Sequence, residues 1–288
     1  DQARLGVNPL KLGFVGSTDT HNSTPGAVEE HENFGARGKL DFRPEQRLKS
    51  GGSFGQPGGL MRSKGGLAGV WAEENSREAI FDARARREAF GTSGPRIQPR
   101  FFGGWEYPAD LCADPDLVAQ AYAQGVPMGG DLSAPLTENA SPTFAVAALR
   151  DPDQDQAPLE RLEIIKGWYE EGELKERVVT VAGADTSGNV DPQTCSRTGT
   201  GHARLCAIWQ DPDFDPDESA FYYARAFENP SCRWSQWVCV EAGVSCSDPS
   251  TMKEGLEGCC SEEHRPIIQE RAWSSPIWYS PSEPEPAG

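Results

Sequence analysis

The chain has 288 residues and a formal net charge of -17, because 44 Asp and Glu residues outnumber 27 Lys and Arg residues. A surface of that sign repels phosphate backbones and anionic lipid headgroups, which makes nucleic acid and membrane surfaces poor partners. No apolar stretch approaches the roughly 20 residues of a membrane-spanning helix, so we expect no membrane span. Hydrophobic residues make up 37% of the chain, enough for a core shared between two structural units.

The first predicted element is the apolar run at residues 12–15, which we expect to be a buried strand leading into a polar loop. The sequence begins at Asp1 without Met, which we interpret as a removed leader or as a fragment of a longer protein. Residues 29–66 are charged and then Gly-rich, with little periodicity. They predict one long loop of the kind that is usually functional or mobile.

Residues 76–90 predict a helix. Asn75 can act as the N-cap with Glu78 three residues further on, in a capping-box arrangement. Acidic side chains stand at the start of the segment and arginines near its end, which complements the helix dipole. Gly91 is the expected stop.

Beyond Pro95 the character of the chain changes. Short apolar runs separated by turn signals predict an antiparallel, sandwich-like unit. The expected strands cover residues 96–102, 143–150, 159–168, 175–182, 203–209 and 220–226. Residues 280–288 are rich in Pro and Glu, and we expect an extended surface tail there.

Seven of the eight cysteines lie in the last third of the chain, and their spacing contains no CxxC pair. This favours disulfides over a metal site and points to the periplasm or the cell exterior. The disulfide candidates are Cys195, Cys206, Cys232, Cys239, Cys246, Cys259 and Cys260. Cys195 with Cys206 is the expected local pair, because an intervening Gly-rich turn would let two strands be clipped together.

Asp19 and His21 are the principal candidate site residues. In an extended strand end, residues i and i+2 project to the same side, so the carboxylate and the imidazole can converge on one cation. Those donors suit zinc, manganese or iron. Asn22 and Thr24 could orient the two ligands. In the structural alternative, Asp19 caps a turn and His21 bonds a backbone carbonyl.

The phrase Gly16-Ser-Thr-Asp-Thr-His-Asn22 resembles the last metal-binding motif of the PHP (polymerase and histidinol phosphatase) superfamily, where a strand ends in Ser-Asp-x-His. The longer phrase over residues 16–26 resembles one PHP-related family of large, mostly secreted bacterial proteins of unknown function. Further stretches that fit the family are residues 65–75, 89–95, 195–204, 228–234 and 268–278. The resemblance covers essentially the whole chain.

The resemblance implies an α/β plus β fold. Residues 1–95 would be the C-terminal part of a PHP-like distorted β/α barrel with a long Gly-rich loop. Residues 96–288 would be an antiparallel, β-rich, disulfide-stabilised accessory region with a Cys-rich tail. The implied function is a metal-dependent hydrolase that acts on phosphoester or related ester bonds of a small-molecule substrate. Two or three divalent ions would bind in the complete site, with metal-bound hydroxide as the nucleophile.

The sequence departs from the PHP pattern in its histidines. PHP sites need an early His-x-His strand, whereas the 4 histidines here include no such pair. We expect the missing ligands in the N-terminal half of the same protein, which this chain lacks, and we expect the chain alone to be inactive. One alternative is a non-catalytic structural or interaction subunit of a secreted assembly. Another is that the N-terminal half is present as a separate chain after nicking.

Other polar side chains are secondary candidates. Arg96 could contact an anionic substrate, although a structural salt bridge is the plainer interpretation. His31 is expected in a solvated acidic loop and His202 in a turn near the disulfides. His264 would suit a metal only if the neighbouring thiols were reduced.

Trp234 and Trp237 lie three residues apart near the cysteines. They could form an aromatic platform, but core packing is favoured.

Overall fold

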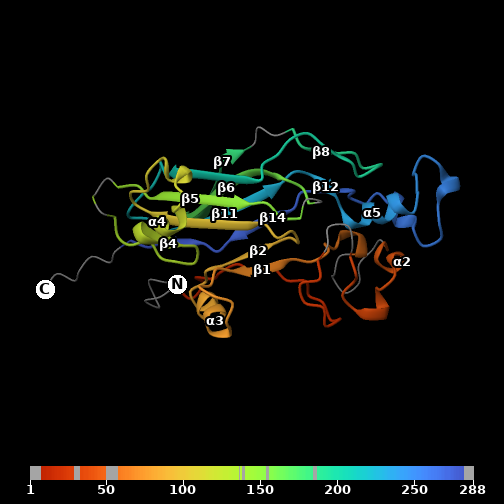
Figure 1. The fold of residues 1–288 in the computed structure, drawn as a ribbon, viewed down its shortest axis with the longest axis horizontal. Coiled ribbons are helices and arrows are strands. Elements are labelled where there is room, and N and C mark those ends of the chain that lie inside the picture. Colours follow the sequence, from red (N-terminus) through yellow and green to blue (C-terminus); the bar gives the residue numbers. More distant parts are fainter. Residues whose placement is uncertain are drawn as a thin grey trace.

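The computed structural model describes residues 8–28, 33–49, 58–135, 137, 140–153, 156–183 and 187–281. Figure 1 shows stacked β-sheets at one end of the elongated molecule and a smaller lobe around α5 and α2 at the other. No helix within these residues is long and apolar enough to cross a membrane.

The larger sheet has seven strands, and every neighbouring pair is antiparallel. Its order is β1 (Leu67–Val70), β2 (Ala89–Thr92), β14 (Arg271–Ser274), β11 (Ala220–Glu228), β6 (Leu159–Glu170) and β7 (Glu173–Gly183), with β15 (Ile277–Tyr279) also paired to β11. The sheet therefore takes strands from both sides of the expected boundary at residue 95, and that division of the chain stays a prediction.

The smaller sheet has four antiparallel strands. Its order is β10 (Arg204–Gln210), β5 (Thr143–Leu149), β3 (Gln98–Gly104) and β4 (Gly125–Pro127). Two short pairs complete the described strands: β12 (Ser231–Cys232) with β13 (Ile267–Ile268), and β8 (Asn189–Val190) with β9 (Arg197–Thr198).

The two sheets pack face to face over the main hydrophobic core. Phe144 of β5 contacts Tyr222 of β11 with ring centroids 4.3 Å apart, and both side chains are fully buried. Phe101, from the neighbouring strand β3, stacks on Phe144 at 5.5 Å. Alternate residues of each strand point into this core, as in other antiparallel sandwiches.

The expected β-rich, antiparallel region is confirmed, and each of the six expected strands overlaps an observed one. The PHP-like barrel is not confirmed, because the described residues form open sheets and no closed barrel. The strand expected at residues 12–15 is wrong: no strand forms there, and Leu12 and Val15 are 61% and 62% exposed. Apolar character predicts burial only where another element covers it.

The described helices are few and short. They are α2 (Pro44–Arg47), α3 (Arg77–Ala85), α4 (Leu117–Gln124) and α5 (Trp234–Glu241), with 3-10 turns η1 (Gly38–Leu40), η2 (Gly59–Met61), η3 (Leu111–Ala113), η4 (Pro249–Thr251) and η5 (Glu257–Cys260).

Helix α3 confirms the helix expected at residues 76–90 but is shorter. Its N-cap is Ser76, whose side chain accepts a hydrogen bond from the Ala79 N–H, and not Asn75. The helix ends because Arg87 takes a left-handed φ of 62° and the Glu88 N–H bonds to Ala83 O, as in a Schellman motif. The expected stop, Gly91, lies in β2 instead.

All eight cysteines are paired, which confirms that the seven candidates form disulfides. The pairs are Cys112–Cys206, Cys195–Cys232, Cys239–Cys259 and Cys246–Cys260. The expected Cys195–Cys206 bond is wrong. Cys206 lies on β10 at the outer face of the smaller sheet, where η3 brings Cys112 to a Cα separation of 5.8 Å.

The smaller lobe is organised by the last two disulfides and a second core. Leu48, Leu60, Trp234 and Leu256 are buried together around the bond between Cys239 of α5 and Cys259 of η5. Four disulfides fit a secreted or extracellular protein, since such bonds persist in oxidising compartments.

Candidate functional site

The segment before Asp19 passes the end of the β1–β2 pair in backbone contact. A Cβ at Gly16 would lie 2.5 Å from Leu67 O and 2.7 Å from Thr92 O, so no other residue fits without displacing the sheet. The Ser17 carbonyl accepts a hydrogen bond of 2.8 Å from the Gly66 N–H. These contacts fix the point at which residues 18–24 leave the sheet.

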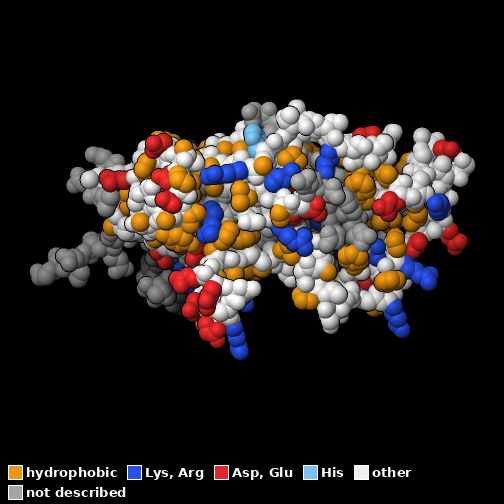
Figure 2. All heavy atoms as spheres, viewed as in Figure 1, with side chains coloured by type: hydrophobic (Ala, Val, Ile, Leu, Met, Phe, Trp, Pro, Cys, Tyr) orange, Lys and Arg blue, Asp and Glu red, His pale blue; other side chains and the backbone are white. Residues whose placement is uncertain are grey.

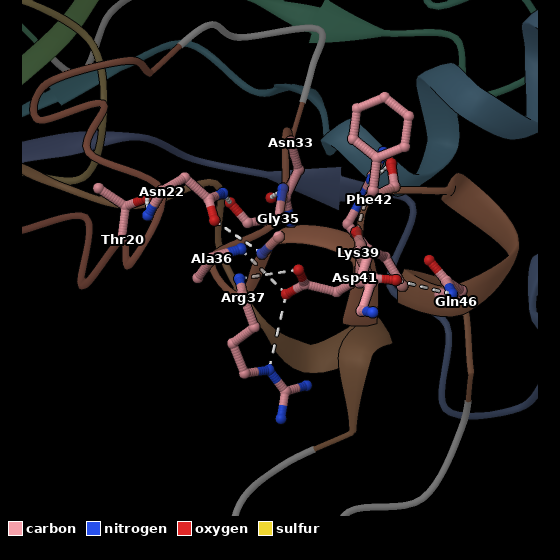
Figure 3. A network of polar contacts seen from close by, with 12 residues as sticks. Thr20, Asn22, Asn33, Gly35, Ala36, Arg37, Lys39, Asp41, Phe42 and Gln46 are labelled. Carbon is pink, nitrogen blue, oxygen red and sulfur yellow. Dashed lines mark hydrogen bonds and ion pairs between the residues drawn. The ribbon is translucent and has the colours of Figure 1, made fainter.

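Asn22 ties this loop to the next one. Its Nδ2 donates to Gly35 O at 3.2 Å, and its Oδ1 accepts from the Gly38 N–H at 2.7 Å. Figure 3 shows the Asn22 side chain between the two segments. The expected role of Asn22 in supporting metal ligands stays a prediction.

The second loop is folded around the buried carboxylate of Asp41. Its oxygens accept hydrogen bonds from the backbone N–H groups of Ala36 at 2.9 Å and Arg37 at 2.8 Å, and Arg37 Nε lies 3.7 Å from Oδ2 (Figure 3). A carboxylate with two backbone donors and a guanidinium is well satisfied. Asp41 is therefore a structural residue that stabilises the loop to which Asn22 is hydrogen-bonded.

Asp19 and His21 both lie exposed on this braced loop. The His21 N–H donates to Ala36 O at 2.8 Å, so the backbone of His21, and not its imidazole, makes the carbonyl contact. Within the described residues, neither the Asp19 carboxylate nor the His21 imidazole has a hydrogen-bond or ion-pair partner. Both side chains are available to a ligand.

The geometry of the pair differs from the expected strand end. Asp19 has a left-handed φ of 50°, with its N–H directed to Ser17 Oγ at 3.3 Å. Asp19 is therefore not in the extended conformation of a strand, and the argument that residues i and i+2 of a strand face the same way does not apply here. Convergence of the two side chains on one cation stays a prediction.

Their donor atoms fit zinc, manganese or iron, but two ligands fall short of the three that a catalytic zinc uses. The described part of the chain holds no group of three or more His, Cys, Asp or Glu side chains that could bind a metal. Thr24 contacts Thr20, with their Oγ1 atoms 3.5 Å apart. His31 lies outside the described residues.

His264 is a structural residue. Its Nδ1 lies 3.0 Å from Cys259 O and its Nε2 3.0 Å from Ser235 Oγ, so both ring nitrogens have partners. Burial lowers the pKa of the imidazole, because it penalises the charged form. The neighbouring cysteines are oxidised, which removes the condition under which His264 was expected to bind a metal.

The remaining candidates lie away from any shared site. His202 exchanges two backbone hydrogen bonds with Leu159, each of 2.9 Å. Arg96 is exposed and makes its hydrogen bond through its backbone N–H, to Asp151 Oδ2. The expected core packing of Trp234 is confirmed by its 2% exposure, and Trp237 packs at the edge of a small core.

A cavity of about 340 Å³ lies elsewhere, on the outer face of the smaller sheet, and the sequence did not reveal it. Arg100, Arg204 and Trp71 contribute to its lining. The sequence signal that could have pointed to the cavity is the alternation along β3, which places Gln98, Arg100 and Phe102 on one face of the sheet. The strands that pair with β3 could not be predicted from the order of the elements along the chain.

The fold defines a β-rich, antiparallel, disulfide-stabilised protein with a braced polar loop that exposes an aspartate and a histidine side chain. Residues 1–281 match the family described as "Protein of unknown function (DUF3604)", and the chain belongs to that family. No curated protein and no solved structure matches the chain. The relation to the PHP superfamily stays a prediction.

Proposed function

We propose that this chain is part of a metal-dependent hydrolase that cleaves phosphoester or related ester bonds. Asp19 and His21 would supply two ligands to a divalent cation, which can be zinc, manganese or iron. The observation that carries the proposal is the contrast within one loop: the backbone is fixed by Gly16, Ser17 and Asn22, while the two ligand side chains are exposed and unpaired within the described residues.

The remaining ligands of the complete site, with its two or three ions, would come from the N-terminal half of the same protein. When bound, the metal would polarise the substrate and supply a metal-bound hydroxide as nucleophile. Asn22 would keep the loop in place through Gly35 and Gly38, and Thr24 would support it through Thr20. Residues 1–95 would complete a PHP-like barrel, with residues 96–288 as an accessory region, in the periplasm or outside the cell.

An interaction role is the second candidate, and one observation favours it. Leu10, Leu12 and Val15 are 68%, 61% and 62% exposed along the segment that leads to the candidate loop. Leu40 and Phe42, beside Asp41, are 66% and 71% exposed. Where exposed apolar side chains adjoin on a surface, they mark a site that another polypeptide can cover. A non-catalytic subunit of a secreted assembly would use the same surface.

The test compares the full-length protein with the 288-residue chain, each loaded with manganese or zinc. Both are assayed on p-nitrophenyl phosphate and on a carbamate ester. We expect turnover by the full-length protein only, and its loss in Asp19→Ala and His21→Ala with the thermal midpoint unchanged. Asp82→Ala, at an exposed position of α3, is the matched control.

Two outcomes oppose the proposal in different ways. Turnover by the 288-residue chain alone would place the active site elsewhere. Inactivity of both proteins, with no metal retained by either, would favour the interaction role.

A further inference from the structure

The cavity on the smaller sheet arises from the register of three strands. Arg100 of β3 pairs with Ala147 of β5, and Ala147 pairs with Cys206 of β10. The next row outward is Gln98, Leu149 and Arg204. Because the central residue Ala147 has only a methyl group, the middle of this face is hollow between β3 and β10, the two arginine-bearing neighbours of β5.

The rest of the outer face is covered. Phe102 and Ala145, one row inward, are buried under Leu117 and Ala121 of α4. The cover ends at the start of that helix, where Asp114, Pro115 and Val118 border the cavity. Figure 2 shows Lys and Arg side chains among hydrophobic ones on the face beside α4. The cavity is thus a gap between a covered and an uncovered half of one sheet face.

Arg100 is held in place without a carboxylate partner. Its guanidinium lies 3.2 Å from the centroid of the Trp71 ring, and Nη1 donates to the Tyr122 hydroxyl at 3.3 Å. No Asp or Glu of the described chain pairs with it. Burial lowers the pKa of Arg100, an effect that Tyr122 and Glu88 partly offset. A bound anion would also favour the charged form.

Arg204 lies on β10, on the other side of β5 from Arg100. Its Nη2 donates to Cys112 O at 3.4 Å, and it has no ion-pair partner in the described part of the chain. The Cys112–Cys206 disulfide fixes η3 against β10, so the wall that Arg204 contacts cannot move freely. Two arginines without carboxylates therefore face one cavity in a protein of net charge -17.

The other lining residues limit the class of ligand. Trp71, Leu117, Val118 and Leu149 give the cavity an apolar body, and its volume of about 340 Å³ lies at the lower end of the range for small-molecule sites. Asp114 is the one acidic residue of the lining, and its carboxylate accepts hydrogen bonds from Gln120 Nε2 and the Asp116 N–H. A dianion would be repelled by Asp114 more strongly than a monoanion.

We infer that this cavity binds a small aromatic carboxylate. The planar guanidinium of one arginine would bind the carboxylate through paired N–H donors, a geometry that suits this group, and the positive charge of the other would add to the attraction, so both Arg100 and Arg204 contribute to the affinity. The aromatic body would lie over Ala147 against Leu117 and Leu149. The inference does not depend on the proposed hydrolase, because it uses none of the residues of the Asp19–His21 loop.

The experiment measures binding of 2-naphthoate to the 288-residue chain by isothermal titration calorimetry. We expect saturable binding to one site, and affinity for the neutral 2-naphthamide lower by about tenfold or more, because a charge-assisted hydrogen bond is lost. Arg100→Gln and Arg204→Gln should each reduce the affinity for naphthoate by about tenfold. Arg177→Gln, on β7 of the other sheet, is the matched control and should bind as the native chain does.

A second variant separates binding from folding. Ala147→Leu fills the hollow while both arginines remain, so it should abolish binding and leave the thermal midpoint nearly unchanged. The inference is overturned if naphthoate does not bind, if Ala147→Leu binds normally, or if both arginine variants retain full affinity. Tighter binding of 2-naphthyl phosphate than of 2-naphthoate would overturn the choice of a carboxylate.

Discussion

The Nζ of Lys64 lies 3.5 Å from Oε1 of Glu270, and the two side chains are only 3% and 4% exposed. Lys64 precedes Gly65, where a Cβ would lie 2.9 Å from Thr18 Cα, next to the candidate loop. Glu270 precedes β14 of the larger sheet. The ion pair therefore anchors the segment that touches the candidate loop to the core of the protein.

Lys64→Met should strongly destabilise the protein. The variant leaves the Glu270 carboxylate buried without its ion-pair partner, and breaking a buried pair in this way costs about 3–5 kcal/mol. Urea denaturation followed by circular dichroism measures the loss. Lys175→Met removes the exposed partner of Glu173 and should cost about 1 kcal/mol or less. A Lys64→Met loss as small as that of Lys175→Met would show that the pair has no structural role.

The double variant Lys64→Met/Glu270→Leu tests the cause of the loss. Replacing both charges with apolar groups removes the buried carboxylate, so most of the lost stability should return. If the double variant is as unstable as Lys64→Met, lost packing and not the unpaired charge explains the effect.

The disulfides should differ in their contribution to stability. Cys112–Cys206 joins positions 94 apart and Cys246–Cys260 positions 14 apart. In the chain-entropy model, closing the longer loop stabilises by about 4–5 kcal/mol and the shorter by about 3 kcal/mol. Replacing each pair with serines and measuring unfolding by urea should reproduce this order. The reverse order would mean that the small lobe, and not loop closure, dominates.

Because of His264, we expect the protein to lose stability at acidic pH. Its pKa is lowered from 6.5 by burial, so the folded state favours the neutral ring and the unfolded state binds the proton first. The stabilising contribution is therefore complete above pH 6.5 and is lost as the pH falls through the lowered pKa of the folded state, with a slope of at most about 1.4 kcal/mol per pH unit. The loss is measured as the shift of the urea midpoint between about pH 7.5 and about pH 5. This range extends about one unit or more to each side of the usual histidine pKa.

The control for this prediction is His202, for which Leu159 supplies backbone hydrogen bonds. His264→Gln keeps a polar side chain of similar length and should remove most of the dependence in this range. His202→Gln should retain it. An unchanged profile in His264→Gln would assign the dependence to other groups.

What could be predicted from the sequence was mostly local. The existence of α3 follows from its local charge and capping pattern, although its N-cap is Ser76 and not Asn75, and the strands after residue 95 follow from alternation and turn residues. The helix end was missed because Arg87 adopts a left-handed conformation that glycine usually supplies.

Tertiary relationships could not be predicted in the same way. The partner of Cys206 depends on η3 folding over the smaller sheet, and Cys112 is far from the other cysteines in the sequence. The hollow at Ala147 exists only once β3, β5 and β10 are in register. For the candidate site, the motif singled out Asp19 and His21 as ligands at a strand end, but the left-handed backbone at Asp19 could not be anticipated from a strand pattern.

Gly16→Ala should displace the candidate loop while leaving the main core folded. The added Cβ would lie within 2.5 Å of Leu67 O, so either the β1–β2 end or the loop must move. The loop is the part that gives way, because β1 and β2 are held by the antiparallel ladder and by β14.

We expect the Ser17–Gly66 hydrogen bond to break, which exposes the Gly66 N–H, and the His21 N–H to lose its protection with it. Hydrogen exchange measured by mass spectrometry should therefore accelerate in peptides covering residues 16–24 and 65–67, with little change in β6 and β11. Val15→Ala is the matched control, because Val15 is 62% exposed and its truncation removes little buried surface. If the loop supplies metal ligands, as proposed, Gly16→Ala should also lower metal affinity. Unchanged exchange in residues 16–24 would show that the backbone contact at Gly16 does not hold the loop.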